Sequence, residues 1–239
     1  MSKILELKNR TQRTVTVRNQ SATKAEIILY AEIGKDWWGD GTYVSAKDFS
    51  DQLNALSPTV NEITLRINSA GGDVFDGITI YNRLRQHKAK KIVYIDGLAA
   101  SIASIIMLAG DEIHIGEGAM VMVHLPWTMS WGNRMDFDNV INRLMDVEDQ
   151  MIGIYARRTG LDKSELRPML EAETYLDADQ AVEKGFVDSK VEDSLPIAAS
   201  LFDREWINKK PKNLRSETAF VSSEIDAVKK KIGDILARK

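Results

Sequence analysis

The chain has 239 residues, of which 32 are Lys or Arg and 35 are Asp or Glu, so its formal net charge is −3. A protein that binds nucleic acid mainly through phosphate contacts carries a basic excess, so this balance argues against that class of function. The sequence contains no Cys, which excludes disulfides, zinc–thiolate sites and cysteine nucleophiles.

Strand and helix patterns alternate along the chain. Apolar runs predict strands over residues 25–32, 62–68, 91–95, 112–115 and 120–124. Helical spacing of apolar residues predicts helices over residues 44–56, 75–87, 98–109, 133–159, 163–170 and 177–184. Strands that alternate with helices form βαβ units, so the sequence predicts an α/β fold.

Several helix ends carry a capping signal. Ser45 is followed three residues later by Asp48, which is the spacing of a capping box for the first helix. Asp177 and Gln180 repeat this spacing at the start of the last predicted helix, which Gly185 ends. These signals assign Asp177 a structural role.

The composition divides the chain into three segments. Residues 1–24 form a polar N-terminal segment, residues 25–194 carry the α/β pattern, and residues 195–239 form a basic linker and tail. The tail contains one amphipathic helical pattern at residues 223–237, and such an isolated helix is marginally stable unless it docks on a partner.

No membrane or export signal is expected. The most apolar run, residues 97–110, is shorter than the roughly 20 residues that a spanning helix needs. The N-terminal segment lacks the apolar core of a signal peptide. We therefore expect a cytoplasmic protein that binds no membrane.

Two junctions between a strand and a helix are candidate sites. The first, NSAGG at residues 68–72, could be a tight glycine turn, a phosphate site at a helix N-terminus, or a turn whose backbone N–H groups bind an oxyanion. Neither a complete dinucleotide-binding motif nor a phosphate-binding loop motif is present. The second, GLAASIAS at residues 97–104, places Ser101 near the start of a buried helix, where the helix dipole favours a developing negative charge. Composition and spacing do not separate Ser101 from Ser104, and either could be a packed small residue.

A serine hydrolase usually needs a base, and the chain has three histidines. His87 lies in a basic helix end and His114 occupies an ordinary strand position. His124 ends an apolar strand beside a loop, where side chains from different elements can meet. His124 is therefore the candidate base, with a buried structural histidine as the alternative.

Four motifs together resemble a known family. They are INSAGGDVFDGITIYN (residues 67–82), GLAASIASIIMLAGDEI (97–113), MVMVHLPW (120–127) and YLDADQAVEKGFVD (175–188). Their order and spacing resemble the proteolytic subunit of the Clp protease, and most of all the Clp-like head-maturation proteases of tailed phages and prophages. The resemblance covers roughly residues 25–190 and implies the ClpP/crotonase fold, a spiral of βαβ units with a long protruding helix, here residues 133–159.

The resemblance also implies roles for individual residues. Ser101, which follows the paired alanines, is the implied nucleophile, and His124 is the implied base. The backbone N–H groups of Gly72 and Ile102 are the implied oxyanion donors. The family's acid falls on Glu173, where the proteolytic subunits have Asp; Asp177 is a rival and Asp179 a more distant one. Ala70 replaces the proline that usually precedes the glycine pair.

The implied activity is that of a serine endopeptidase that needs no metal or organic cofactor. Its substrate would be an extended peptide or protein segment, and the likeness to phage proteins suggests capsid or scaffold processing in a bacterial cell or infected host. Alternatives are acyl-CoA chemistry on the same fold and a catalytically inactive assembly subunit.

The resemblance points to a homo-oligomeric ring of seven subunits, single or double, and no residue indicates whether an ATP-dependent unfoldase is needed. Apolar residues without an evident intramolecular contact also indicate an interface; these are Trp37, Trp38, Met145, Ile152 and Ile154.

Overall fold

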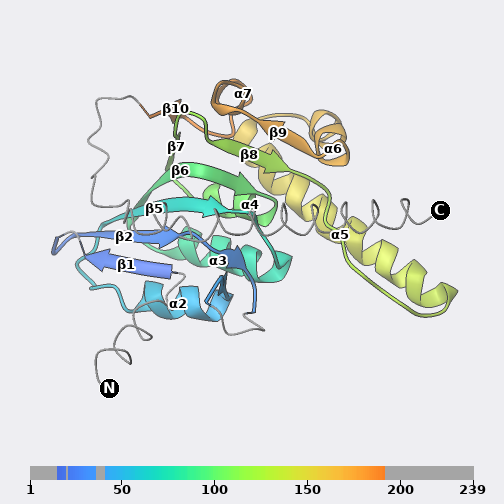
Figure 1. The fold of residues 1–239 in the computed structure, drawn as a ribbon, viewed down its shortest axis with the longest axis horizontal. Helices are drawn as coiled ribbons and strands as arrows, with labels where there is room; N and C mark the ends of the chain where they lie inside the picture. Colours follow the sequence, from blue (N-terminus) through green and yellow to red (C-terminus); the bar gives the residue numbers. More distant parts are fainter. Residues whose placement is uncertain (1–14, 20, 36–40, 192–239) are drawn as a thin grey trace, which may run out of the picture. The chain divides into compact units, whose positions relative to one another are not determined.

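The computed structural model describes residues 15–19, 21–35 and 41–191 (Figure 1). The predicted tail after residue 194 and the pair Trp37 and Trp38 lie outside these residues. Among the described helices, none combines the length and the apolar character that crossing a bilayer requires.

A mixed sheet forms the centre of the described chain. Its strands are β1 (Val15–Asn19), β2 (Lys24–Leu29), β5 (Glu62–Ser69), β6 (Lys90–Ala100), β7 (Glu112–Ile115), β8 (Met120–Val123), β9 (Thr174–Leu176) and β10 (Ser189–Lys190). Two short strands, β3 (Glu32–Ile33) and β4 (Tyr43–Val44), pair separately. The helices are α2 (Ala46–Asn54), α3 (Val74–Gln86), α4 (Ile102–Met107), α5 (Arg134–Thr159), α6 (Lys163–Glu171) and α7 (Ala178–Glu183).

The sheet divides at its longest strand. Its strands run in the order β1-β2-β5-β6-β7-β10, while β8 pairs with the last residues of β6 and then with β9. The pairs are parallel except that β1 is antiparallel to β2 and β9 is antiparallel to β8. Alternate residues of β5 are buried, as expected for a strand with one face against helices. The α/β pattern predicted from the sequence is confirmed.

Most predicted elements are confirmed, including the capping boxes at Ser45 and Asp177. The helix predicted over residues 98–109 starts too early, because residues 98–100 belong to β6 and α4 begins at Ile102. Leu98, Ala99 and Ala100 pair with β8, and this pairing outweighs their apolar helical pattern. Strand β1 lies within the segment that was predicted as a polar N-terminus.

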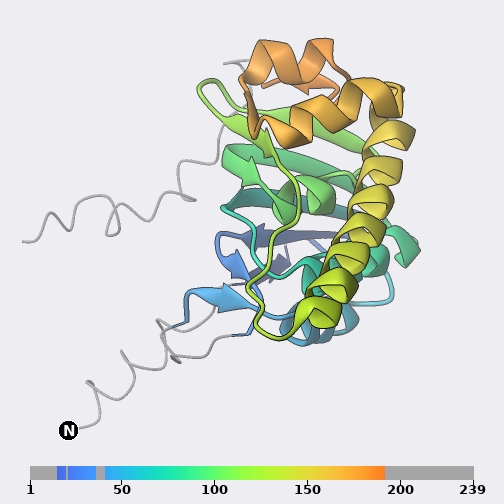
Figure 2. The same ribbon diagram turned by 90° about the vertical axis from the view of Figure 1, so that its right-hand side faces the viewer.

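The long helix α5 divides into an exposed half and a buried half, and Figure 2 shows it crossing one side of the stacked strands. Met145 is exposed, as predicted, but the prediction for Ile152 and Ile154 is wrong, because both are buried in the core. The C-terminal half of α5 packs against α4 and α6, and this contact covers both side chains. The exposed apolar residues near its other end are Trp127, Met129, Trp131, Met135, Phe137 and Ile141.

Helices α3 and α4 approach closely because α3 presents a glycine at their contact. A Cβ atom on Gly77 would lie 2.2 Å from Cγ1 of Ile102, the buried first residue of α4. This distance is far below van der Waals contact, so only glycine fits without movement of Ile102. The contact therefore fixes where α4 begins relative to α3.

We predict that Gly77→Ala destabilises the protein by about 1–3 kcal/mol through overpacking, although alanine favours a helix over glycine by about 1 kcal/mol. Urea unfolding would measure the change. Gly153→Ala in α5 is the control, because its Cβ would meet only the end of Arg157 at 3.7 Å. The double variant with Gly77→Ala and Ile102→Ala should lose less stability than the sum of the losses in the two single variants. Equal stability of the two glycine variants would contradict the prediction.

Candidate active site

Ser101 occupies the junction between β6 and α4. Its backbone has φ 54° and ψ −128°, a left-handed conformation that side-chain-bearing residues rarely adopt. Its N–H donates to the carbonyl of Met122 at 2.9 Å, which ties the junction to β8. The sharp reversal leaves the Ser101 side chain half-buried at the end of the strand instead of packed within the helix.

His124 follows the last residue of β8 and faces this serine. Because β8 pairs with the end of β6, with Ala100 opposite Met122, the two strand ends lie side by side. His124 Nε2 lies 2.7 Å from Ser101 Oγ. When the serine hydroxyl donates in this bond, Nε2 is the acceptor, which is the arrangement of a general base.

The other two histidines have different partners. His87 ends α3, and its Nδ1 accepts from the N–H of Ala89 at 3.2 Å. His114 lies in β7, where its Nδ1 is 2.9 Å from the hydroxyl of Ser189. Neither is hydrogen-bonded to Ser101, so the structure brings together the serine and the histidine that the sequence favours.

The glycine turn packs directly against the serine junction. Gly71 has φ 96°, and a Cβ there would lie 2.7 Å from both the carbonyl oxygen of Ala100 and Cβ of Ser101. Gly72 has φ 139°, and its Cβ would lie 2.0 Å from the carbonyl oxygen of Ile33. Both positions therefore require glycine for steric reasons as well as for backbone conformation.

Two backbone N–H groups at this contact have no acceptor within the described chain, those of Gly72 and Ile102. The bridge between the turn and Ile33 uses the carbonyl of Gly71 and the N–H of Asp73, which leaves out the Gly72 N–H. Ile102 is the first residue of α4, where an N–H has no partner inside the helix. Gly72 is exposed, whereas Ile102 is fully buried.

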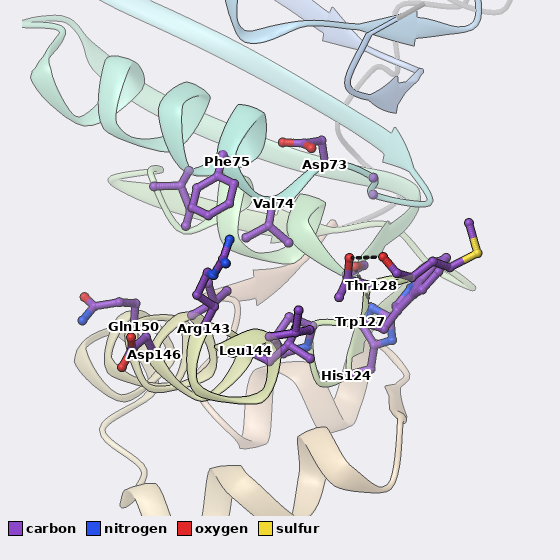
Figure 3. Close-up of a pocket in the computed structure, with 18 of the residues that line it drawn as sticks. Asp73, Val74, Phe75, His124, Trp127, Thr128, Arg143, Leu144, Asp146 and Gln150 are labelled. Atoms are coloured by element: carbon purple, nitrogen blue, oxygen red, sulfur yellow. Dashed lines mark hydrogen bonds between the residues drawn. The ribbon is translucent and has the colours of Figure 1, made fainter. Parts of the chain in front are cut away.

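A cavity of about 1030 Å³ opens beside Ser101 and His124. Figure 3 shows Val74 and Phe75 of α3 facing Arg143 and Leu144 of α5 across it. Its remaining wall includes Pro126, Trp127, Thr128, Met129 and Ser130 of the loop after β8. The lining combines these apolar side chains with charged and polar ones, which include Glu32, Asp73, Arg143, Asp146 and Gln150.

No signal in the amino-acid sequence predicts this cavity. A spacing of four and three residues between Val140, Leu144 and Val147 places them on one face of α5, but the same spacing equally predicts a core-facing stripe. The loop residues carried no secondary-structure signal. Only the folded arrangement of α3 and α5 shows that these side chains line a cavity.

The candidate acids take different positions. Asp177 accepts from the N–H of Gln180 in its capping box, and Asp179 is paired with Lys190. Glu173 is exposed, has φ 50°, and stands between α6 and β9. Among the described residues, no carboxylate is hydrogen-bonded to His124.

Glu173 and His124 each adjoin the last pair of the β8–β9 ladder. Strands β8 and β9 pair antiparallel with Val123 opposite Thr174, so the next residue on each side is His124 and Glu173. The N–H groups of Leu125 and Glu173 both donate to the carbonyl of Leu170, each at 3.2 Å.

Residues 9–194 match the protein family described as Clp protease, and the chain therefore belongs to the Clp protease family. The ATP-dependent Clp protease proteolytic subunit of Deinococcus radiodurans is 26% identical over 145 residues, covering 59% of this chain and 69% of the relative. The chloroplastic ATP-dependent Clp protease proteolytic subunit 3 of Arabidopsis thaliana is 29% identical over 137 residues, covering 56% of this chain and 44% of the relative.

A solved structure of a mutant of ClpP1 from Listeria monocytogenes is similar to the chain with a TM-score of 0.61 and 23% sequence identity. The match covers 71% of this chain and 92% of that structure. It confirms the predicted fold class, a mixed α/β fold with a central sheet like that of ClpP.

Proposed function

We propose that the chain is a serine endopeptidase with Ser101 as nucleophile and His124 as general base. The observation that supports this most strongly is the 2.7 Å hydrogen bond between His124 Nε2 and Ser101 Oγ beside a cavity. Membership of the Clp protease family supports the same reaction class. The backbone N–H groups of Gly72 and Ile102, which have no acceptor among the described residues, would bind the oxyanion that acyl transfer requires.

The reaction follows from this arrangement. Ser101 Oγ attacks the scissile carbonyl carbon while His124 Nε2 takes the hydroxyl proton. The negative charge that develops on the carbonyl oxygen is stabilised by the N–H groups of Gly72 and Ile102. His124 then gives the proton to the leaving amine, and a water molecule activated by the same imidazole hydrolyses the acyl-enzyme.

The substrate we propose is an extended peptide segment. Apolar side chains of the segment would enter the cavity between α3 and α5, where Val74, Phe75 and Leu144 supply apolar surface. Extended peptides bind by backbone pairing along an accessible segment, with side-chain pockets that supply selectivity. The likeness of the motifs to phage and prophage proteases leads us to propose capsid or scaffold proteins as the physiological substrate.

Glu173 is the acid that we propose to orient His124. The β8–β9 register and the shared Leu170 carbonyl support this choice over Asp177, whose carboxylate caps α7. Glutamate is one methylene longer than aspartate and can reach an imidazole from a slightly greater distance. Glutamate serves as the acid in other serine hydrolases.

We also propose that the protein acts as a homo-oligomeric ring. The exposed apolar residues at the N-terminal end of α5 and in the preceding loop support a contact between subunits, because monomers rarely expose large apolar patches. The family resemblance points to seven subunits in a ring. A need for an unfoldase partner has no support in the described residues.

The nucleophile is tested by Ser101→Ala and Ser104→Ala, assayed for peptide cleavage and for labelling by a fluorophosphonate probe. Loss of the nucleophile should lower kcat by several orders of magnitude, on the order of 10⁶ in a comparable serine protease. Ser104→Ala should have a mild effect by comparison and should still be labelled. Labelling that survives in Ser101→Ala but is lost in Ser104→Ala would reverse the assignment, and an unlabelled native protein would indicate an inactive assembly subunit.

The acid is tested by Glu173→Gln, which keeps the shape of the side chain but removes its charge. An analogous acid-to-amide change lowers kcat by about 10⁴, because the amide favours the wrong imidazole tautomer. Asp177→Ala is the matched control and should cost about 1 kcal/mol of stability, as for a lost N-cap, with activity kept. Activity lost in Asp177→Ala and kept in Glu173→Gln would exchange the two roles.

The ring is tested by light scattering at micromolar concentration, where we expect a mass near seven or fourteen times that of one chain. The physical reason is burial of the exposed apolar surface between subunits. Met145→Glu should weaken the assembly by placing a charge in that surface. A monomeric mass for the native protein would exclude the ring.

A further inference from the structure

A buried pair of hydroxyl groups lies directly behind the proposed nucleophile. Ser104 in α4 and Tyr155 in α5 are both fully buried. Ser104 Oγ lies 2.5 Å from the carbonyl oxygen of Ser101 and 2.6 Å from the hydroxyl oxygen of Tyr155. The three groups form a continuous hydrogen-bonded chain from the long helix to the backbone of the nucleophile.

The direction of this chain follows from proton counting. A carbonyl oxygen only accepts, so the single hydroxyl proton of Ser104 is donated to Ser101. Tyr155 must then donate to Ser104 Oγ. Burial raises the pKa of Tyr155, so its hydroxyl keeps the proton that this bond requires. Successive hydrogen bonds that point the same way strengthen one another.

These hydrogen bonds act on the peptide group between Ser101 and Ile102, which the proposed reaction uses. The carbonyl of Ser101 and the N–H of Ile102 belong to one planar trans peptide, in which they point in opposite directions. The carbonyl is held from one side by Ser104 through its hydroxyl at 2.5 Å and its N–H at 3.0 Å. The N–H at the other end meets the glycine turn, where a Cβ on Gly71 would lie 3.2 Å from it. Holding the carbonyl therefore orients the N–H.

We propose that Ser104 and Tyr155 are positioning residues that hold the 101–102 peptide so that the Ile102 N–H is aimed at the oxyanion. This inference rests on the proposed peptidase function. A helical serine that donates to a carbonyl three residues back is a common local contact. The tyrosine comes from a different helix and makes this contact a tertiary restraint. It links the packing of α5 to the geometry of the site.

The experiment compares Tyr155→Phe, Ser104→Ala and the double variant by peptide hydrolysis, with active sites counted by fluorophosphonate titration. Removing an oxyanion donor outright costs about 10²–10³ in kcat, and a donor that is present but less well oriented should cost less, about tenfold. We expect KM to stay within about twofold, because the donor acts mainly in the transition state. The double variant should lose no more than Ser104→Ala, because both changes break one chain.

A second readout separates positioning from general packing. The rate of fluorophosphonate labelling should fall by the same factor as kcat, because the phosphonyl oxygen occupies the oxyanion position. Phe186→Leu is the control variant. The centroids of the Phe186 and Tyr155 rings are 5.7 Å apart, so the smaller leucine side chain loosens this packing without removing a hydroxyl group. It should lower the Tm and leave kcat unchanged when assayed well below that Tm.

The outcomes distinguish the two proposals. If Tyr155→Phe and Ser104→Ala lower the Tm like Phe186→Leu while kcat and the labelling rate stay at the native values, the pair is core packing only and the inference is overturned. A native protein that neither cleaves peptides nor reacts with the probe overturns the proposed function and the inference with it.

Discussion

The left-handed backbone of Ser101 is the constraint on which the rest of the site depends. A residue with a side chain in such a conformation costs of order 1–3 kcal/mol, so its surroundings must hold it in place. Three contacts do so: the carbonyl of Met122 accepts its N–H, Ser104 holds its carbonyl, and Gly71 leaves room for its Cβ. The same turn directs the hydroxyl toward His124.

Strand β6 holds this turn in place because its two halves pair with different strands. Residues Ile92–Ile95 pair with β7, while Leu98–Ala100 pair with β8, so the two parts of one strand position two different neighbours. The strand ends that carry the serine and the histidine therefore lie next to each other without a long flexible connection. The antiparallel partner β9 extends the same ladder, whose last pair, Val123 and Thr174, precedes His124 on one strand and follows Glu173 on the other. Groups positioned by sheet pairing are held more rigidly than groups on free loops.

Helix α5 joins the core, the cavity and the surface in one element. Its C-terminal half is part of the core, where Ile152 and Tyr155 are fully buried. Its N-terminal half presents Leu144 to the cavity and Met145 to the outside. A subunit contact at the exposed end would therefore act on the same rigid helix that lines the cavity and carries Tyr155.

The sequence by itself determined the α/β class, most elements, the capping residues and the serine and histidine candidates, because these depend on local periodicity, local hydrogen bonds and a short inventory of residue types. The motif resemblance already selected Ser101 over Ser104 as the implied nucleophile, but only the tertiary structure shows what each serine contacts: Ser101 meets His124 and Ser104 meets Tyr155. It also decided that residues 98–100 form a strand and that Ile152 is buried, because both depend on partners distant in the chain. Long-range pairing and packing have no local signature, and for this reason the cavity and the hydrogen-bonded hydroxyl groups behind Ser101 emerge only in the folded molecule.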